Sequence, residues 1–138
     1  ELYIASAADK TMSVATESGR VLWSQDLGSV TGVTVSRRSL YLSDNESVVH
    51  QLNRADGVKG WSQDAMKNRG LTRPSFYLGD LLVGDLEGYI HVLDGQSGEI
   101  LTRLRAGDSS FYHAPLVVGD VAYSYSVDGT LTAYTYTK

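Results

Sequence analysis

Apolar and polar residues alternate along most of this chain, in stretches of four to six positions separated by glycine-containing turns. Alternation with a period of two is typical of strands with one buried face, and no stretch shows the 3.6-residue period of an amphipathic helix. Turns such as EG, SG and DG between the stretches indicate hairpins. We therefore expect an all-β chain. The clearest strands are expected at residues 2–6, 39–44, 80–85, 89–94, 99–105, 115–120 and 130–136.

The turn glycines recur at a nearly constant interval. Gly19 and Gly57 are 38 residues apart, and Gly57 and Gly98 are 41 residues apart. Trp23 and Trp61 are also 38 residues apart, and each follows its glycine by four positions. A repeat of about 40 residues built from short strands is typical of a β-propeller blade, whereas helical repeats of that length would need amphipathic helices.

The repeat divides the chain into about three and a half to four blades of four antiparallel strands. The expected repeats span residues 1–28, 31–64, 72–106 and 113–138, with the first entering at its second strand and the last ending after its third. Propellers close with four to eight blades, and an open arc would expose apolar blade faces. We expect either further sequence or a second copy to complete the ring.

Composition narrows the classes of function. The chain has 138 residues, is 42% hydrophobic and carries a net charge of −4, which argues against nucleic acid as a partner because phosphate contacts need a basic face. There is no cysteine, so disulfides, thiol catalysis and Cys-ligated zinc are excluded. No run of about 18 apolar residues predicts a membrane span, and the N-terminus lacks an initiator Met and a signal-peptide pattern. We therefore interpret the chain as an excerpt of a longer protein.

No motif predicts a metal, a cofactor or catalysis. His50 and His91 occupy the same position of two repeats and so belong to different blades, and His113 begins another unit. The acidic turns fail the EF-hand spacing, and Asx turns account for most of them. G-x-S-x-G, H-E-x-x-H and glycine-rich phosphate loops are absent from the sequence.

The segments VATESGRVLW, LNRADGVKGW and VLDGQSGEILT resemble the PQQ-type propeller repeat, whose blades carry a pattern close to A-x-D-x-x-T-G-x-x-x-W. In the third segment Thr102 takes the tryptophan position. The tryptophan of that repeat docks one blade on the next. The resemblance implies a structural role for the repeat residues, which are Gly19, Trp23, Gly57, Trp61 and Gly98.

A second resemblance covers nearly the whole chain. The run that starts at RVLWSQDLGSV, the segment LVGDLEGYIHVLDGQSGEI and the end DGTLTAYTYTK resemble the C-terminal part of the BamB family of outer-membrane protein assembly factors. The resemblance implies a non-enzymatic scaffold from an eight-bladed parent at the periplasmic face of the Gram-negative outer membrane. It also implies binding to the POTRA domains of BamA, association with other BAM components, and help in barrel-protein insertion, with strand addition to unfolded outer-membrane proteins as a further role.

Parts of the family pattern lie outside this chain. The L-x-L-R-G and D-x-D loops of the family lie upstream, as does the lipid-bearing cysteine, so no residue here inherits the BamA contact or the membrane anchor. Two alternatives stay open: an excerpt of a PQQ-dependent dehydrogenase, and a propeller sensor or interaction domain of another periplasmic protein. Two copies of the arc could also pair into a ring, so self-association is a further hypothesis.

One loop is a candidate partner-binding site. The segment MKNRGLTRP places Lys67, Arg69 and Arg73 around Leu71 in an otherwise acidic chain. Arginine is favoured where carboxylates are bound through two hydrogen bonds. We therefore expect this loop, if it binds a partner, to bind an acidic protein surface.

Overall fold

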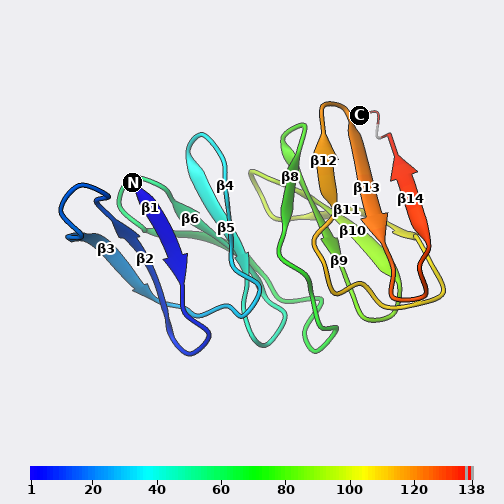
Figure 1. Cartoon of the computed structure of the whole chain (residues 1–138), viewed down its shortest axis with the longest axis horizontal. Helices are drawn as coiled ribbons and strands as arrows, with labels where there is room; N and C mark the ends of the chain where they lie inside the picture. Colours follow the sequence, from blue (N-terminus) through cyan, green and yellow to red (C-terminus); the bar gives the residue numbers. More distant parts are fainter. Residues whose placement is uncertain (136, 138) are drawn as a thin grey trace.

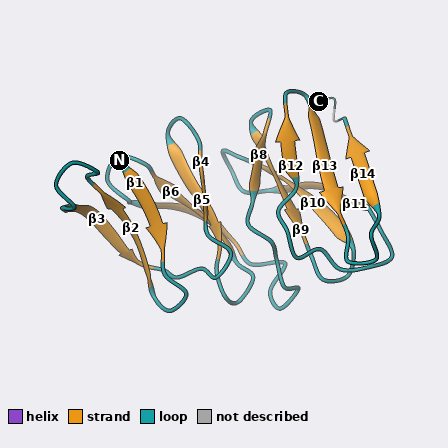
Figure 2. Ribbon diagram, viewed as in Figure 1, coloured by secondary structure: helices purple, strands orange, loops and turns teal. Residues whose placement is uncertain are grey.

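The chain forms strands and loops only in the residues that the computed structural model describes, which are 1–135 and 137. Figure 2 shows this all-strand composition, and the described part of the chain holds no helix long and apolar enough to cross a membrane. The strands are β1 (Leu2–Ala5), β2 (Lys10–Val14), β3 (Val21–Asp26), β4 (Val33–Val35), β5 (Ser39–Ser43), β6 (Val49–Asn53), β7 (Lys59–Gln63), β8 (Ser75–Tyr77), β9 (Asp80–Gly84), β10 (Tyr89–Asp94), β11 (Ile100–Arg105), β12 (Leu116–Val118), β13 (Val121–Tyr125) and β14 (Leu131–Tyr134).

In the described part of the chain the strands form four antiparallel sheets, which follow the sequence in order as β1-β2-β3, β4-β5-β6-β7, β8-β9-β10-β11 and β12-β13-β14. Each sheet is a meander of neighbouring hairpins, and the sheets stand side by side like the blades of a propeller (Figure 1). The first strands of successive blades are neighbours, with β4 beside β8 and β8 beside β12. The predicted all-β arc of three- and four-stranded blades is therefore confirmed.

Several strands are shorter than the alternation predicts. Residues 115–120 were expected to form one strand, but β12 ends at Val118, because Gly119 adopts a φ of +62° in the turn that leads into β13. The third repeat was expected to begin at residue 72, but its first strand forms only at Ser75–Tyr77, directly after Pro74, which has no N–H to donate to a neighbouring strand. The last expected strand, 130–136, forms at Leu131–Tyr134, and Tyr136 lies outside the described residues.

Hydrogen bonds between the first strands of neighbouring blades repeat with the sequence. The hydroxyl of Thr34 in β4 donates to the carbonyl of Pro74 at 2.5 Å, and the hydroxyl of Ser75 in β8 donates to the carbonyl of Pro115 at 2.5 Å. Both bonds join residues 40 positions apart, one blade further along the chain. The same interaction therefore links two successive pairs of blades.

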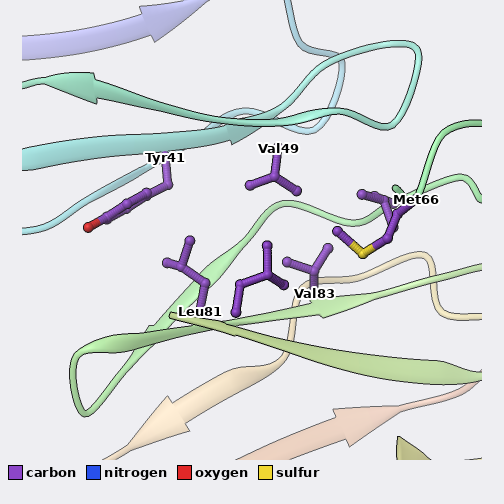
Figure 3. Close-up of a cluster of buried hydrophobic side chains, with 7 residues drawn as sticks. Tyr41, Val49, Met66, Leu81 and Val83 are labelled. Carbon is purple, nitrogen blue, oxygen red and sulfur yellow. The ribbon is translucent and has the colours of Figure 1, made fainter. Parts of the chain in front are cut away.

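The hydrophobic core lies between the blades, where the buried side chains of the described residues form three separate clusters. One of them fills the space between the second and third blades with Tyr41, Val49, Met66, Leu81 and Val83, whose side chains point toward one another in Figure 3. Val49, Leu81 and Val83 are fully buried. Because each cluster takes side chains from two sheets, a blade buries its apolar faces only against its neighbours.

The repeat tryptophans fasten one blade to the next. Trp23 of β3 donates its indole N–H to the carbonyl of Arg54 in the second blade at 3.1 Å, and Trp61 of β7 donates to the carbonyl of Gly95 in the third at 3.3 Å. Each indole also lies flat against the turn glycine of that neighbouring blade. A Cβ built on Gly57 would lie 2.4 Å from Cε3 of Trp23, and one on Gly98 would lie 2.3 Å from Cε3 of Trp61.

Alanine at Gly98 is expected to lower the free energy of unfolding by about 2–5 kcal/mol. The positive φ of +76° costs about 1–2 kcal/mol for a residue with a Cβ, and the overlap with the indole adds about 1–3 kcal/mol. Gly19 is the matched control, because its φ is +70° but nothing lies within 4 Å of its Cβ position. Urea unfolding of Gly19→Ala should show only the backbone cost, and equal losses in the two variants would rule out the indole contact as a cause.

Candidate functional site

The loops of the arc lie at two opposite ends of the blades. The segments that lead into β4 and β8 run along the bottom of the view in Figure 1, whereas the β4–β5 turn lies at its top. The candidate loop from the sequence belongs to the bottom end, since it connects β7 to β8. The positions of its four candidate residues decide which of them can reach a partner.

Arg69 points inward to the third blade. Its Nε donates to Oδ2 of Asp85 at 2.7 Å and its Nη2 donates to Oε2 of Glu87 at 2.9 Å, and 21% of the side chain is exposed. The hydrogen bond to Asp85 raises the pKa of the guanidinium. Arg69 therefore ties the β7–β8 loop to the turn between β9 and β10.

Asp85 is the centre of a buried polar network. Its side chain is 0% exposed and accepts hydrogen bonds from the backbone N–H groups of Glu87 and Tyr89, besides the bond from Arg69. Nε2 of His91 lies 2.8 Å from Oδ2 of Asp85 and, because a carboxylate can only accept, carries the hydrogen. Burial alone would raise the pKa of Asp85, but these hydrogen bonds outweigh it and hold the pKa below its ordinary value.

A second aspartate and histidine pair occupies the same place one blade earlier. Nε2 of His50 lies 2.8 Å from Oδ2 of Asp44, which also accepts from the backbone N–H groups of the β5–β6 turn. The two histidines thus close the turns of their own blades. In the described residues no group of three or more His, Asp and Glu side chains is arranged to hold a metal ion. The aspartate six residues before each histidine was the sequence signal for these pairs, and sequence reasoning missed it.

The other loop residues divide between the core and the surface. Leu71 is only 7% exposed and packs in the cluster between the second and third blades. Lys67 is half exposed and lies 4.0 Å from Asp64. Arg73 is exposed and forms no ion pair with any described residue. Of the four, Lys67 and Arg73 therefore present their side chains to solvent.

Arg73 lines a hollow that the entry loops of three blades form together. The hollow has a volume of about 290 Å³, and the loops before β4, β8 and β12 contribute to its lining. Besides Arg73, the main side chains are Val30, Thr31, Tyr112 and His113. Tyr112 is 66% exposed and Val30 is 70% exposed. We name this site the entry-loop hollow; sequence analysis did not find it, because its residues lie up to about 80 positions apart and share no motif.

The residue types of the entry-loop hollow suit recognition of a protein. Arginine and tyrosine are enriched among residues that contribute most to binding energy. The guanidinium offers five N–H donors to a carboxylate, and the phenol and imidazole add hydrogen bonds beside an apolar valine. The arrangement can bind an acidic or polar group through several contacts at once.

Comparison with known proteins identifies relatives along the whole chain. A family model described as outer membrane protein assembly factor BamB matches residues 1–63 and 45–138. BamB of Shewanella oneidensis is 34% identical over 134 residues, which cover 97% of this chain and 34% of that protein. BamB of Pseudomonas aeruginosa is 33% identical over 134 residues, covering 97% of this chain and 35% of that protein. The chain thus spans about a third of the length of these relatives.

Solved structures agree with the sequence comparison. The crystal structure of BamB from Moraxella catarrhalis superimposes with a TM-score of 0.89 and 28% identity, over 97% of this chain and 40% of that one. A quinohemoprotein alcohol dehydrogenase from Pseudomonas putida superimposes with a TM-score of 0.65 over 75% of this chain and 18% of its own. Its sequence identity of 21% shows a shared fold and nothing about activity.

Proposed function

Because the chain belongs to the BamB family of outer membrane protein assembly factors, we propose that it acts without catalysis, as a propeller scaffold of the machinery that assembles outer-membrane β-barrel proteins. In this role it works on the periplasmic side of the outer membrane, and the parent protein supplies any lipid anchor. The observation that carries the proposal is the family match along the entire chain. The rigid inter-blade packing and the exposed entry loops support it.

The partner that we propose is the POTRA region of BamA, together with other components of the assembly machinery. The entry-loop hollow is the proposed contact in this chain, because it joins a guanidinium without an ion pair to any described residue, a tyrosine that is 66% exposed and an exposed valine. Of the predicted loop, Arg73 and Lys67 keep a binding role in this proposal. Arg69 and Leu71 support the site by holding the loop in place.

Truncation of Arg73 tests this proposal. The Arg73→Ala variant is expected to bind purified BamA POTRA domains about tenfold more weakly, since a central arginine contact contributes more than about 1 kcal/mol. Isothermal titration calorimetry with the full chain measures the change. Tyr112→Ala should show a loss of similar size.

The matched control is Arg20→Ala, which removes an exposed arginine in the β2–β3 turn at the other end of the blades. Its affinity should equal that of the unaltered chain. An unchanged affinity in both Arg73→Ala and Tyr112→Ala would exclude the entry-loop hollow as the contact. No binding by the unaltered chain would contradict BamA as a partner of this chain.

A further inference from the structure

A second hollow lies at the opposite end of the second blade and is lined by arginines. It has a volume of about 540 Å³, and its main side chains are Glu1, Arg37, Arg38, Asn53 and Arg54. The arginines come from two neighbouring turns, β4–β5 and β6–β7. We name this site the arginine hollow.

The positive charge in the arginine hollow is largely uncompensated. Arg37 and Arg38 are exposed, and neither forms an ion pair with a described residue, although the chain has more acidic than basic residues. Among the described residues that line the hollow, Glu1 is the one carboxylate, and its Oε2 already accepts a hydrogen bond from the hydroxyl of Tyr3 at 2.5 Å. Three guanidiniums thus face a single carboxylate.

Arg54 is held in a fixed orientation at the wall of this hollow. Its Nε donates to the hydroxyl of Tyr3 at 2.8 Å, its Nη1 donates to the carbonyl of Ser36 at 3.4 Å, and its guanidinium lies 5.5 Å from the centre of the Tyr3 ring. No described residue accepts a hydrogen bond from Nη2 of Arg54, so its donors are available to a ligand. A guanidinium that is already positioned loses less conformational entropy when it binds a carboxylate.

The arginine hollow continues into a second depression around the rim of the same blade. That depression has a volume of about 270 Å³ and shares Arg38 and Asn53 with the first hollow. Lys59, at the start of the outermost strand β7 of the blade, also lines this depression. The basic surface is therefore elongated and much larger than a single carboxylate or phosphate.

From this surface we infer that the chain has a second binding site, at Arg37, Arg38 and Arg54, for an extended acidic segment of a partner protein. The elongated shape and the series of cations match a polypeptide with several neighbouring carboxylates, each of which a guanidinium binds through two hydrogen bonds. A long polyanion such as nucleic acid fits less well, because the chain as a whole carries a charge of −4 and repels it outside this patch.

The experiment measures fluorescence anisotropy of two labelled ten-residue peptides against the full chain. One peptide alternates glutamate with serine, and the other has glutamine in place of each glutamate. The glutamate peptide is expected to bind at least tenfold more tightly, and its affinity should fall as salt rises from 50 to 300 mM, since exposed charges are screened. The double variant Arg37→Ala and Arg38→Ala should lose at least tenfold in affinity.

Two controls separate this site from the entry-loop hollow. Arg73→Ala should leave binding of the glutamate peptide unchanged, and the double variant at Arg37 and Arg38 should leave binding of POTRA domains unchanged. Both altered residues are exposed and lie in a turn, so the double variant is expected to fold, which circular dichroism checks. If the binding test of one of these two sites fails, the result for the other site therefore still stands.

The inference would be overturned by equal binding of the two peptides, by unchanged binding of the glutamate peptide by the double variant, or by binding of a ten-nucleotide single-stranded DNA as tight as that of the glutamate peptide. Full displacement of the peptide by an equal concentration of inorganic phosphate would also overturn it, because it would reveal a site for a simple anion.

Discussion

The Asp85→Ala variant is expected to lose about 3–5 kcal/mol of unfolding free energy, because it breaks a buried ion pair by removing one partner. The carboxylate is 0% exposed, and without it Arg69 and His91 lose their shared acceptor inside the protein. Two backbone N–H groups of the β9–β10 turn lose their acceptor as well. Urea unfolding followed by circular dichroism measures the loss as a shift of the midpoint at constant slope.

The equivalent aspartate one blade earlier is the control. Asp44 also closes its turn and pairs with a histidine, but it is 18% exposed and, among the described residues, no arginine forms an ion pair with it. Asp44→Ala should cost about 1–2 kcal/mol, since water can replace part of what is lost. A loss as large as that of Asp85→Ala would show that Arg69 adds nothing to the network.

The same network predicts how stability depends on pH. Because the folded protein holds the pKa of Asp85 below its ordinary value of 3.8, the ionised carboxylate adds stability at pH values above 3.8. That contribution is lost as the pH falls through the folded pKa. The Asp85→Asn variant keeps the shape of the side chain but cannot ionise, so its stability should fall less steeply below pH 3.8. Parallel curves for the two proteins would contradict a lowered pKa.

The Trp23→Ala variant is expected to lose about 3–5 kcal/mol, as is typical for removing a buried aromatic side chain. Trp23 is 9% exposed and packs in the cluster between the first and second blades with Leu27, Leu40 and Leu52. Its loss opens a cavity against Gly57 and leaves the carbonyl of Arg54 without its indole donor. Trp61 remains as a fluorescent reporter of unfolding.

Thr102→Ala is the control for this experiment, because Thr102 takes the tryptophan position in β11 and its side chain is exposed. Its replacement should change stability by less than about 0.5 kcal/mol. If Trp23→Ala cost less than 1 kcal/mol, the indole would not be the fastener between the first two blades.

The positions of the strands and the length of the repeat could be predicted well from the sequence. Alternation places an apolar side chain on one face at every second position, so strands such as Tyr89–Asp94 are found where the pattern predicts them. The period of about 40 residues identifies the blade as the unit, since Trp23 and Trp61 make the same contact with successive neighbours. The ends of the strands were less predictable. A turn glycine such as Gly119 ends a strand without changing the hydrophobicity of the alternating sequence pattern.

The candidate sites were only partly predictable. The sequence groups Lys67, Arg69, Leu71 and Arg73 within seven positions, but it does not reveal which side chains face solvent. Arg69 turns inward because Asp85, 16 positions away, offers a buried acceptor, and Leu71 turns inward because it fills a space between two sheets. Arg73 instead lines the entry-loop hollow, to which Tyr112 from the loop of the next blade also contributes.

The sequence by itself determined the strands, the turns and the repeat, since these depend on alternation and on glycine, which act over a few residues. Only the tertiary structure decided which charges are neutralised and which are left free. Arg69 and Arg37 are both arginines in the same acidic chain. Arg69 forms an ion pair with a buried carboxylate, whereas Arg37 faces an open hollow. Electrostatic attraction depends on distance in space, and the stacking of blades sets that distance between residues far apart in the sequence.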